Sequence, residues 1–323
     1  MADAWLPERT LRQHSLTDKM PCMEVDELLN RFGLKEFFPE KITLGDIISI
    51  DIHPKPLGLK NIPWLMLRDI INTAETNTID ELLFDSDEHL DVNPLDFLLL
   101  ILLCCSSSLK QVVAYKLFLC KLSIPLVYPF LDNGKLIVRV WPLQQIIIEN
   151  KILQKVSVEC PCQVISFVRL GRPTISKSKL INELLHEQYH DTFFNRDCPL
   201  GTNKRLISEG LIETMWYIPT TNTSKPDDLL ELKDVTMFLN LRGDGEDQVQ
   251  QLDFLSHLSS VIVVVIDISY LNKENDTLFK LPNCKGIVLV IDASQTDRKT
   301  TRLLLQTYLK QNSENKHFFG VLS

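Results

Sequence analysis

The chain has 323 residues, of which 45% are hydrophobic and 24% are charged. That composition is typical of a folded globular protein, and at roughly 100–200 residues per domain the length suggests two domains. The 34 basic and 42 acidic side chains give a formal net charge of −8. Because nucleic-acid binding needs a strongly basic surface, we expect no nucleic-acid partner.

The sequence contains no segment that indicates membrane insertion or export. The longest apolar run, Phe97 to Cys105, is far shorter than the roughly 20 residues that a membrane-spanning helix needs. Residues 1–20 are charged throughout and do not resemble a signal peptide. The eight cysteines are scattered, without a C-x-x-C pair, which favours a reducing compartment inside the cell. We therefore expect no transmembrane segment and a cytoplasmic location.

The first half of the chain predicts helices. Apolar residues recur at helical spacing in five segments, which are 25–34, 44–50, 63–71, 97–105 and 109–120. The last two of these predict a hairpin of two buried helices. The polar stretch 72–92 predicts a solvated connector, and residues 136–141 fit either a strand or the start of a helix. We predict a mainly α-helical domain over residues 1–158.

After residue 160, strand-like and helix-like segments alternate. The strand-like segments are 164–170, 210–218, 235–241, 261–266, 286–291 and 317–322, and the helix-like ones are 179–187, 248–258 and 298–311. Continuous apolar runs such as Val261 to Ile266 are typical of strands that are covered on both faces. The alternation predicts an α/β domain with a mostly parallel sheet over residues 159–323. We expect this domain to lack its closing helix.

One motif in the second domain carries chemistry. Gly171 to Ser178 has the spacing of the phosphate-binding loop G-x4-G-K-[ST], except that Ser176 replaces the second glycine. In such a loop, backbone N–H groups at a helix N-terminus hold phosphates, Lys177 reaches the β- and γ-phosphates, and the Ser178 hydroxyl binds Mg²⁺. A strand precedes the loop and a helix follows it, as the motif requires. The alternative is a Gly/Pro loop followed by a chance Ser-Lys-Ser helix start.

Three further segments match the spacing of a P-loop GTPase. The segment from Asn240 to Gly243 stands where D-x-x-G is expected. Gly243 would meet the γ-phosphate, and Asn240 would reach a Mg²⁺-bound water without an aspartate's charge; the alternative is a strand-ending turn. Thr202 is a candidate first-switch threonine and second Mg²⁺ ligand. Asp297 could read guanine, although the Asn and Lys of N-K-x-D are missing, and a solvated acidic loop is the alternative.

These motifs resemble those of the very large interferon-inducible GTPase family, to which the up-regulator of cell proliferation proteins also belong. In the α/β half, the segments that carry the resemblance are 165–171, 176–178, 181–185, 195–197, 200–203, 207–213 and 238–244. In the helical half they are 92–96, 117–120 and 124–127. The resemblance therefore covers nearly the whole chain.

The resemblance implies a fold, a ligand and a setting. It implies a P-loop GTPase-like α/β fold, with GTP as the ligand and Mg²⁺ as its metal, in a family that also carries serine at the second glycine position and N-L-R-G at the second switch. It further implies G-domain dimers or a protein partner, and a cytoplasmic and nuclear location. Since family members are far longer than this chain, we expect a fragment or a shortened form.

Two functions follow as alternatives. The first is a GTP-binding module with slow or partner-stimulated hydrolysis, because no water-positioning glutamine follows Gly243, where Asp244, Gly245 and Glu246 come next. The second is a pseudo-GTPase, an interaction scaffold that keeps the fold and binds no nucleotide. Ser176, Asn240 and the missing N-K-x-D lysine favour the second.

Overall fold

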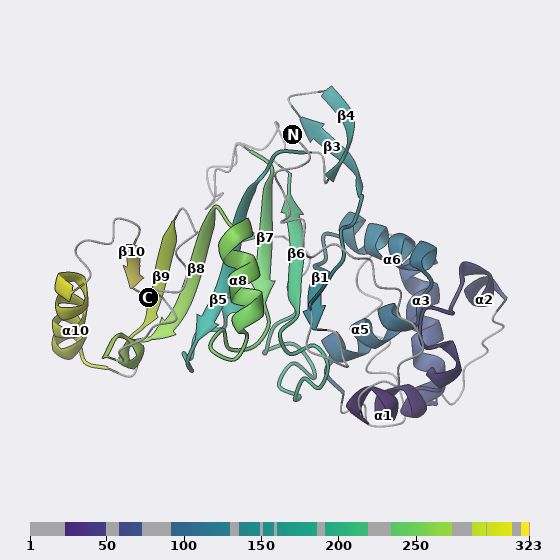
Figure 1. Ribbon diagram of the computed structural model, residues 1–323, viewed down its shortest axis with the longest axis horizontal. Coiled ribbons are helices and arrows are strands. Elements are labelled where there is room, and N and C mark those ends of the chain that lie inside the picture. The colour runs from purple at the N-terminus through teal and green to yellow at the C-terminus, as the bar shows by residue number, and fades with distance from the viewer. Residues whose placement is uncertain are drawn as a thin grey trace.

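A large mixed sheet carries helices on both faces, and a further group of helices lies beside one edge of it (Figure 1). The computed structural model describes residues 23–49, 58–72, 92–129, 136–148, 151–157, 160–185, 191–218, 234–272, 286–294, 296–311 and 318–322. The predicted connector at 72–92 lies almost entirely outside these residues.

The helices beside the sheet edge are α1 (Met23–Arg31), α2 (Leu44–Ile48), α3 (Ile62–Asn72), α5 (Pro94–Cys104) and α6 (Ser107–Leu119). Short 3₁₀ turns cover Lys35–Phe37 and Leu59–Asn61. Helix α5 begins after Asn93, whose side chain accepts a hydrogen bond from the Leu95 N–H at 3.0 Å, with Pro94 in the first turn. The apolar segments at helical spacing therefore do fold as helices in this part of the chain.

The sheet has eight strands in the order β10-β9-β8-β5-β7-β6-β1-β2. Their bounds are β1 (Ile124–Pro129), β2 (Leu136–Val138), β5 (Gln163–Leu170), β6 (Ile212–Tyr217), β7 (Thr236–Leu241), β8 (Val261–Asp267), β9 (Ile287–Asp292) and β10 (Phe318–Leu322). Strands β10, β9, β8, β5 and β7 are parallel to one another, whereas β6 is antiparallel to β7 and to β1. A separate antiparallel pair is formed by β3 (Gln144–Ile148) and β4 (Lys151–Val156).

Strands β1 and β2 extend the sheet across the predicted domain boundary at residue 158. Strand β1 pairs antiparallel with β6 in the register Ile124 to Thr214, and β2 pairs antiparallel with β1. Residues 136–141, which fit a strand or a helix by pattern, contain the strand β2. Residues from the first half of the chain thus belong to the same sheet as the second half.

The two faces of the sheet are covered by different helices. Along β5, side chains alternate between the faces because successive residues of a strand point in opposite directions. Val164, Val168 and Leu170 belong to the buried cluster that includes α8 (Val249–Leu258) and α10 (Arg298–Gln311). Phe167 belongs instead to the cluster that includes Ile181 of α7 (Lys177–Leu185). Alternating strands and helices therefore give the expected α/β architecture.

The helix group and the sheet share one core at the sheet edge. Ile124 and Tyr128 of β1, together with Ile207 and Leu211, are buried in the same cluster as the α5 and α6 side chains. The indole Nε1 of Trp141 donates a hydrogen bond to the Pro125 carbonyl at 2.7 Å. This shared core fixes the N-terminus of α5 against the loop that precedes β6.

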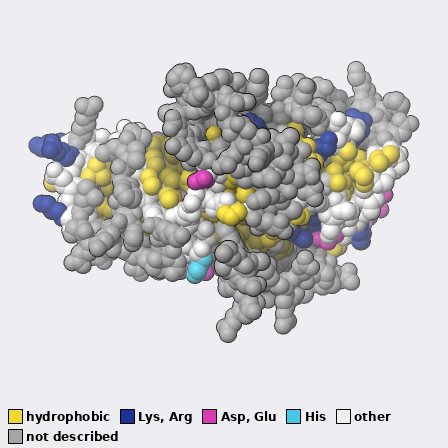
Figure 2. All heavy atoms as spheres, turned by 90° about the horizontal axis from the view of Figure 1, so that it is seen from above, with side chains coloured by type: hydrophobic (Ala, Val, Ile, Leu, Met, Phe, Trp, Pro, Cys, Tyr) yellow, Lys and Arg dark blue, Asp and Glu magenta, His cyan; other side chains and the backbone are white. Residues whose placement is uncertain are grey.

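Seen from above, the molecule carries described Lys and Arg side chains at the end where α10 lies (Figure 2). Lys299 and Arg302 are exposed there. Within the described ranges, no helix has the length and hydrophobicity needed to cross a bilayer.

Candidate functional site

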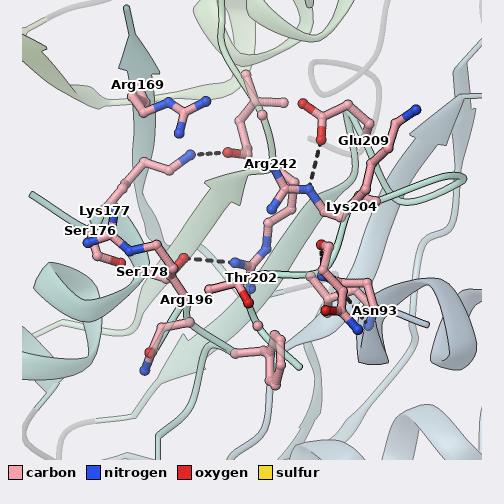
Figure 3. Close-up of a pocket in the computed structure, with 18 of the residues that line it drawn as sticks. Asn93, Arg169, Ser176, Lys177, Ser178, Arg196, Thr202, Lys204, Glu209 and Arg242 are labelled. Atoms are coloured by element: carbon pink, nitrogen blue, oxygen red, sulfur yellow. Dashed lines mark hydrogen bonds and ion pairs between the residues drawn. The ribbon is translucent and has the colours of Figure 1, made fainter. Parts of the chain in front are cut away.

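A cavity of about 500 Å³ opens at the carboxyl end of β5 (Figure 3). From β5 the chain first adds β6 and β7 on one side of the sheet, and then adds β8, β9 and β10 on the other. Strand β5 is therefore the topological switch point, the place where open α/β sheets bind their ligands. The loop that follows β5 leads directly into α7 and forms one wall of this cavity.

The loop after β5 is anchored to two neighbouring strands. Gly171 has φ +75°, and a Cβ there would lie 2.8 Å from the Asp267 carboxylate at the end of β8, so this position favours glycine. Asp292, at the end of β9, accepts hydrogen bonds from the Thr174 N–H and hydroxyl at 2.5 Å each. Although burial raises the pKa of Asp292, hydrogen bonds from Thr174 and Ser294 hold it well below its ordinary value.

Lys177 lies at the first position of α7 and is buried. Its Nζ donates a hydrogen bond to the Leu241 carbonyl at the end of β7. Burial lowers the pKa of this ammonium well below its ordinary value, and the nearby Arg242, Arg169 and Arg205 lower it further. A buried cation among three other cations is an environment that an anionic ligand would relieve.

Ser178 is held by two donors. Its hydroxyl oxygen accepts from Arg242 Nη1 at 2.8 Å and from Asn240 Nδ2 at 3.2 Å. The Arg242 guanidinium also forms a buried ion pair with Glu213 through Nε. Both lone pairs of the hydroxyl are therefore in use, and only its proton is left to offer.

This arrangement does not fit Mg²⁺ at the predicted ligands Ser178 and Thr202. Mg²⁺ needs oxygen lone pairs, commonly with one or two carboxylates nearby. Thr202 lines the cavity and is exposed, but the lone pairs of Ser178 are taken and a guanidinium stands beside it. Among the described residues, no group of three or more His, Cys, Asp and Glu side chains could hold a metal. The sequence motif could not predict this, because it says nothing of where the Arg242 side chain points.

Gly243 forms another part of the wall. It has φ +92°, and a Cβ there would overlap the Glu209 carboxylate. Glu209 in turn accepts a hydrogen bond from Arg205 Nε at 2.7 Å. The backbone of the predicted second switch is thus closely packed against a carboxylate that an arginine holds in place.

The helix group completes the cavity. Asn93 and Leu95 line it, and Asn93 Nδ2 donates to the Asn203 carbonyl at 2.9 Å. The fully buried Asp96 carboxylate accepts from the backbone N–H groups of residues 206, 207 and 208 at 2.6, 3.1 and 2.7 Å. The N-terminus of α5 therefore holds the loop that carries Thr202.

Cations dominate the cavity wall. The basic residues that line it are Arg169, Lys177, Arg196, Lys204, Arg205 and Arg242. Among the described lining residues one, Glu209, is acidic. Arg169 Nε and Arg242 Nη2 are buried without a hydrogen-bond partner among the described residues. Both the charge and the unused donors point to an anionic ligand.

The structure brings most of the predicted site residues together. Ser176, Lys177, Ser178, Thr202 and Gly243 all line the cavity. Their roles toward a nucleotide remain predictions.

Three of the predicted residues do not line the cavity. Gly171 shapes the loop behind it, and Asn240 is fully buried beside Ser178. Asp297 accepts from the backbone N–H groups of Lys299 and Thr300 at 3.0 Å each, so it caps the start of α10.

The sequence analysis did not predict the basic side chains of the cavity wall. These residues come from separate segments, and the net charge of −8 conceals them. Of these basic residues, Arg242 could have been identified from the sequence, because it lies within the N-L-R-G segment.

The cation-lined cavity at the switch point makes this an α/β protein with a candidate anion-binding site. Comparison with known proteins shows the family to which it belongs. Residues 92–321 match the family model of the up-regulator of cell proliferation-like domain, so the chain belongs to this family. This confirms the family resemblance that the motifs predict.

The relatives include large inducible GTPase-family proteins. The chain is 30% identical over 296 residues to up-regulator of cell proliferation of Homo sapiens, covering 75% of this chain and 31% of that protein. It is 27% identical over 313 residues to interferon-induced very large GTPase 1 of Mus musculus, covering 79% and 12%. It is 32% identical over 188 residues to caspase recruitment domain-containing protein 6 of Homo sapiens, covering 54% and 18%. The chain thus spans about a third or less of each of these relatives.

Proposed function

We propose that this chain is the GTP-binding module of a large GTPase-like protein, with a P-loop GTPase-like fold. The observation that carries the proposal is the position of Lys177 and Ser178 at the switch point of the sheet, in a cavity lined by six basic residues. Backbone N–H groups at the start of α7 and the surrounding cations suit a polyphosphate. The preference for guanine rests on relatives whose names include GTPase.

Hydrolysis by the chain alone is slow in this proposal. Of the carboxylates after Gly243, Glu246 accepts a hydrogen bond from the Tyr270 hydroxyl at 2.8 Å. Glu209, the acidic residue on the described cavity wall, is paired with Arg205. Both carboxylates are already engaged, and none of the three residues after Gly243 is a water-positioning glutamine, so we expect turnover to depend on a group that a partner or a second copy supplies.

The second candidate function is a pseudo-GTPase scaffold that binds no nucleotide. Its support is that Lys177 Nζ is engaged by the Leu241 carbonyl and Ser178 by Arg242, so a phosphate must displace existing contacts. The two candidates differ in one measurable quantity, the affinity of the empty chain for GTP.

Calorimetric titration of the intact chain with GTP and with ATP separates them. The proposal expects binding of GTP in preference to ATP, and loss of binding in Lys177→Ala. The matched control is Lys179→Ala, in the same helix, whose exposed ammonium pairs with Asp197 at 3.4 Å and does not line the cavity. Absence of GTP binding by the wild-type chain supports the scaffold instead. Equal GTP affinity in Lys177→Ala and the wild type overturns the phosphate-loop assignment.

A further inference from the structure

The side chain of Arg242 stands beside the hydroxyl that the sequence motif assigns to Mg²⁺. Resting on the proposed function, we propose that the cavity binds a metal-free polyphosphate, with the Arg242 guanidinium supplying the positive charge that Mg²⁺ supplies in other P-loop proteins. The inference concerns the form of the ligand and the residue that recognises it.

The orientation of Arg242 is fixed by its neighbours. Its side chain is 6% exposed, Nε is paired with Glu213, and Nη1 donates to Ser178 at 2.8 Å. Since the ion pair and the hydrogen bond hold two sides of the planar guanidinium, the third nitrogen has little freedom to turn away. That nitrogen, Nη2, is buried and has no hydrogen-bond partner among the described residues. A buried, charged donor without a partner is costly, and a phosphate oxygen would satisfy it.

The Ser178 hydroxyl favours an anion over a metal for the same reason. Because both of its lone pairs accept hydrogen bonds from Arg242 and Asn240, it can act only as a donor toward the cavity. A donor repels a cation and binds a phosphate oxygen. Asn240 has its Nδ2 on Ser178, so the neutral amide at this position orients the hydroxyl rather than a metal-bound water.

The positive charge on the cavity wall also favours a metal-free anion. Six lining residues are basic and, among those described, only Glu209 is acidic. A metal-free triphosphate carries two more negative charges than its Mg²⁺ complex, so these cations attract the metal-free form more strongly. Mg²⁺ in solution would therefore compete with the protein for the phosphates.

The first test is a pair of calorimetric titrations of the full chain, with GTP and with inorganic tripolyphosphate, in excess EDTA and in excess Mg²⁺. We expect both probes to bind in EDTA at least as tightly as in Mg²⁺. GTP binding that is about tenfold or more weaker in EDTA overturns this inference and leaves the proposed function standing. Tripolyphosphate binding in EDTA without any preference for GTP supports the inference and contradicts the guanine assignment. Absence of binding under all four conditions overturns both.

The second test removes the guanidinium without leaving a buried charge unpaired. Arg242→Gln is combined with Glu213→Gln, because either change alone would strand its partner. We expect the double variant to lose about tenfold or more of its tripolyphosphate affinity in EDTA, since a charge-assisted hydrogen bond is lost. Arg302→Gln, on the exposed surface of α10, is the matched control and should bind like the wild type. Unchanged affinity in a folded double variant overturns the role of Arg242.

Ser178→Ala gives an answer even where the double variant does not fold. A hydroxyl that donates to phosphate contributes equally with and without metal, so the variant should lose the same factor of affinity for GTP in EDTA and in Mg²⁺. A loss confined to Mg²⁺ identifies Ser178 as a metal ligand and overturns the inference.

Discussion

The carboxylate of Asp96 accepts a hydrogen bond from the backbone N–H of Ser208 at 2.7 Å, although 112 positions separate the two residues in the chain. Asp96 lies in the first turn of α5, and Ser208 lies in the loop between the Thr202 segment and β6. The same carboxylate also accepts from the N–H groups of residues 206 and 207. The helix group therefore holds one wall of the cavity in place.

We expect Asp96→Asn to destabilise the chain by about 2 kcal/mol, because an amide offers one acceptor oxygen where three N–H groups donate to the two oxygens of the carboxylate. The free energy of unfolding from urea titration measures this. The control is Asp253→Asn, whose carboxylate on α8 is 74% exposed. Equal unfolding midpoints for the two variants would show that the contact between α5 and the loop contributes no stability.

Gly243→Ala should cost about 1–3 kcal/mol, because φ +92° is strained for any residue with a Cβ. The added Cβ would also displace the Glu209 carboxylate and with it the contact to Arg205. Gly58→Ala is the control, since Gly58 has φ −74° and open space around it. The thermal unfolding midpoints of both variants measure this cost. A Gly243→Ala midpoint equal to that of Gly58→Ala contradicts the predicted strain.

Lys177→Met should raise the stability of the ligand-free chain while removing nucleotide binding, because it eliminates a buried cation surrounded by Arg242, Arg169 and Arg205. The effect depends on pH. The pKa of Lys177 is lowered in the folded chain, so the unfolded chain binds more protons between that lowered value and 10.5, and wild-type stability rises with pH through this window. The stability advantage of Lys177→Met is therefore largest below the lowered pKa and shrinks as the pH rises toward about 10. A gap that stays constant up to about pH 10 would contradict a lowered pKa of Lys177 in the folded chain.

Asp292→Asn should weaken the anchor of the loop after β5, because one of the two carboxylate oxygens that accept from Thr174 and Ser294 becomes a donor. The pKa of Asp292 lies well below its ordinary 3.8 in the folded chain, so its contribution to stability is complete above about pH 4 and is lost as the pH falls through the lowered pKa. Urea unfolding at neutral and acidic pH should show the gap between wild type and variant closing in acid. Asp247→Asn, at an exposed carboxylate, should show no such trend.

Much of the fold could be predicted from hydrophobic periodicity. The strand-like run 164–170 corresponds to β5, and residues 298–311 are predicted and found as a helix. Strand β1 escaped prediction because the run around Pro125 is short and apolar, and such runs do not distinguish a strand from the end of a helix. Its pairing with β6 joins segments about 90 residues apart, which local pattern does not reveal.

The residues of the candidate site that belong to a sequence motif could be predicted, and the other lining residues could not. The Ser-Lys-Ser segment identified Lys177 and Ser178 as candidates, and both lie on the cavity wall, while their roles toward a nucleotide stay predictions. The direction of Arg242 depends on its ion pair with Glu213, a contact that forms only when β6 and β7 align. Asp297 matched by spacing alone, and in the structure its hydrogen bonds are those of a helix cap.

The central claim is that the cavity binds the phosphates of GTP, and the thermal unfolding midpoint with and without GTP tests it most directly. Ligand at about 100 times its Kd stabilises the folded state by about 2.7 kcal/mol. We expect GTP to raise the midpoint of the wild-type chain and of Lys179→Ala, and to leave that of Lys177→Ala unchanged. A wild-type midpoint that does not move at any GTP concentration, or an equal rise in Lys177→Ala, would contradict the account.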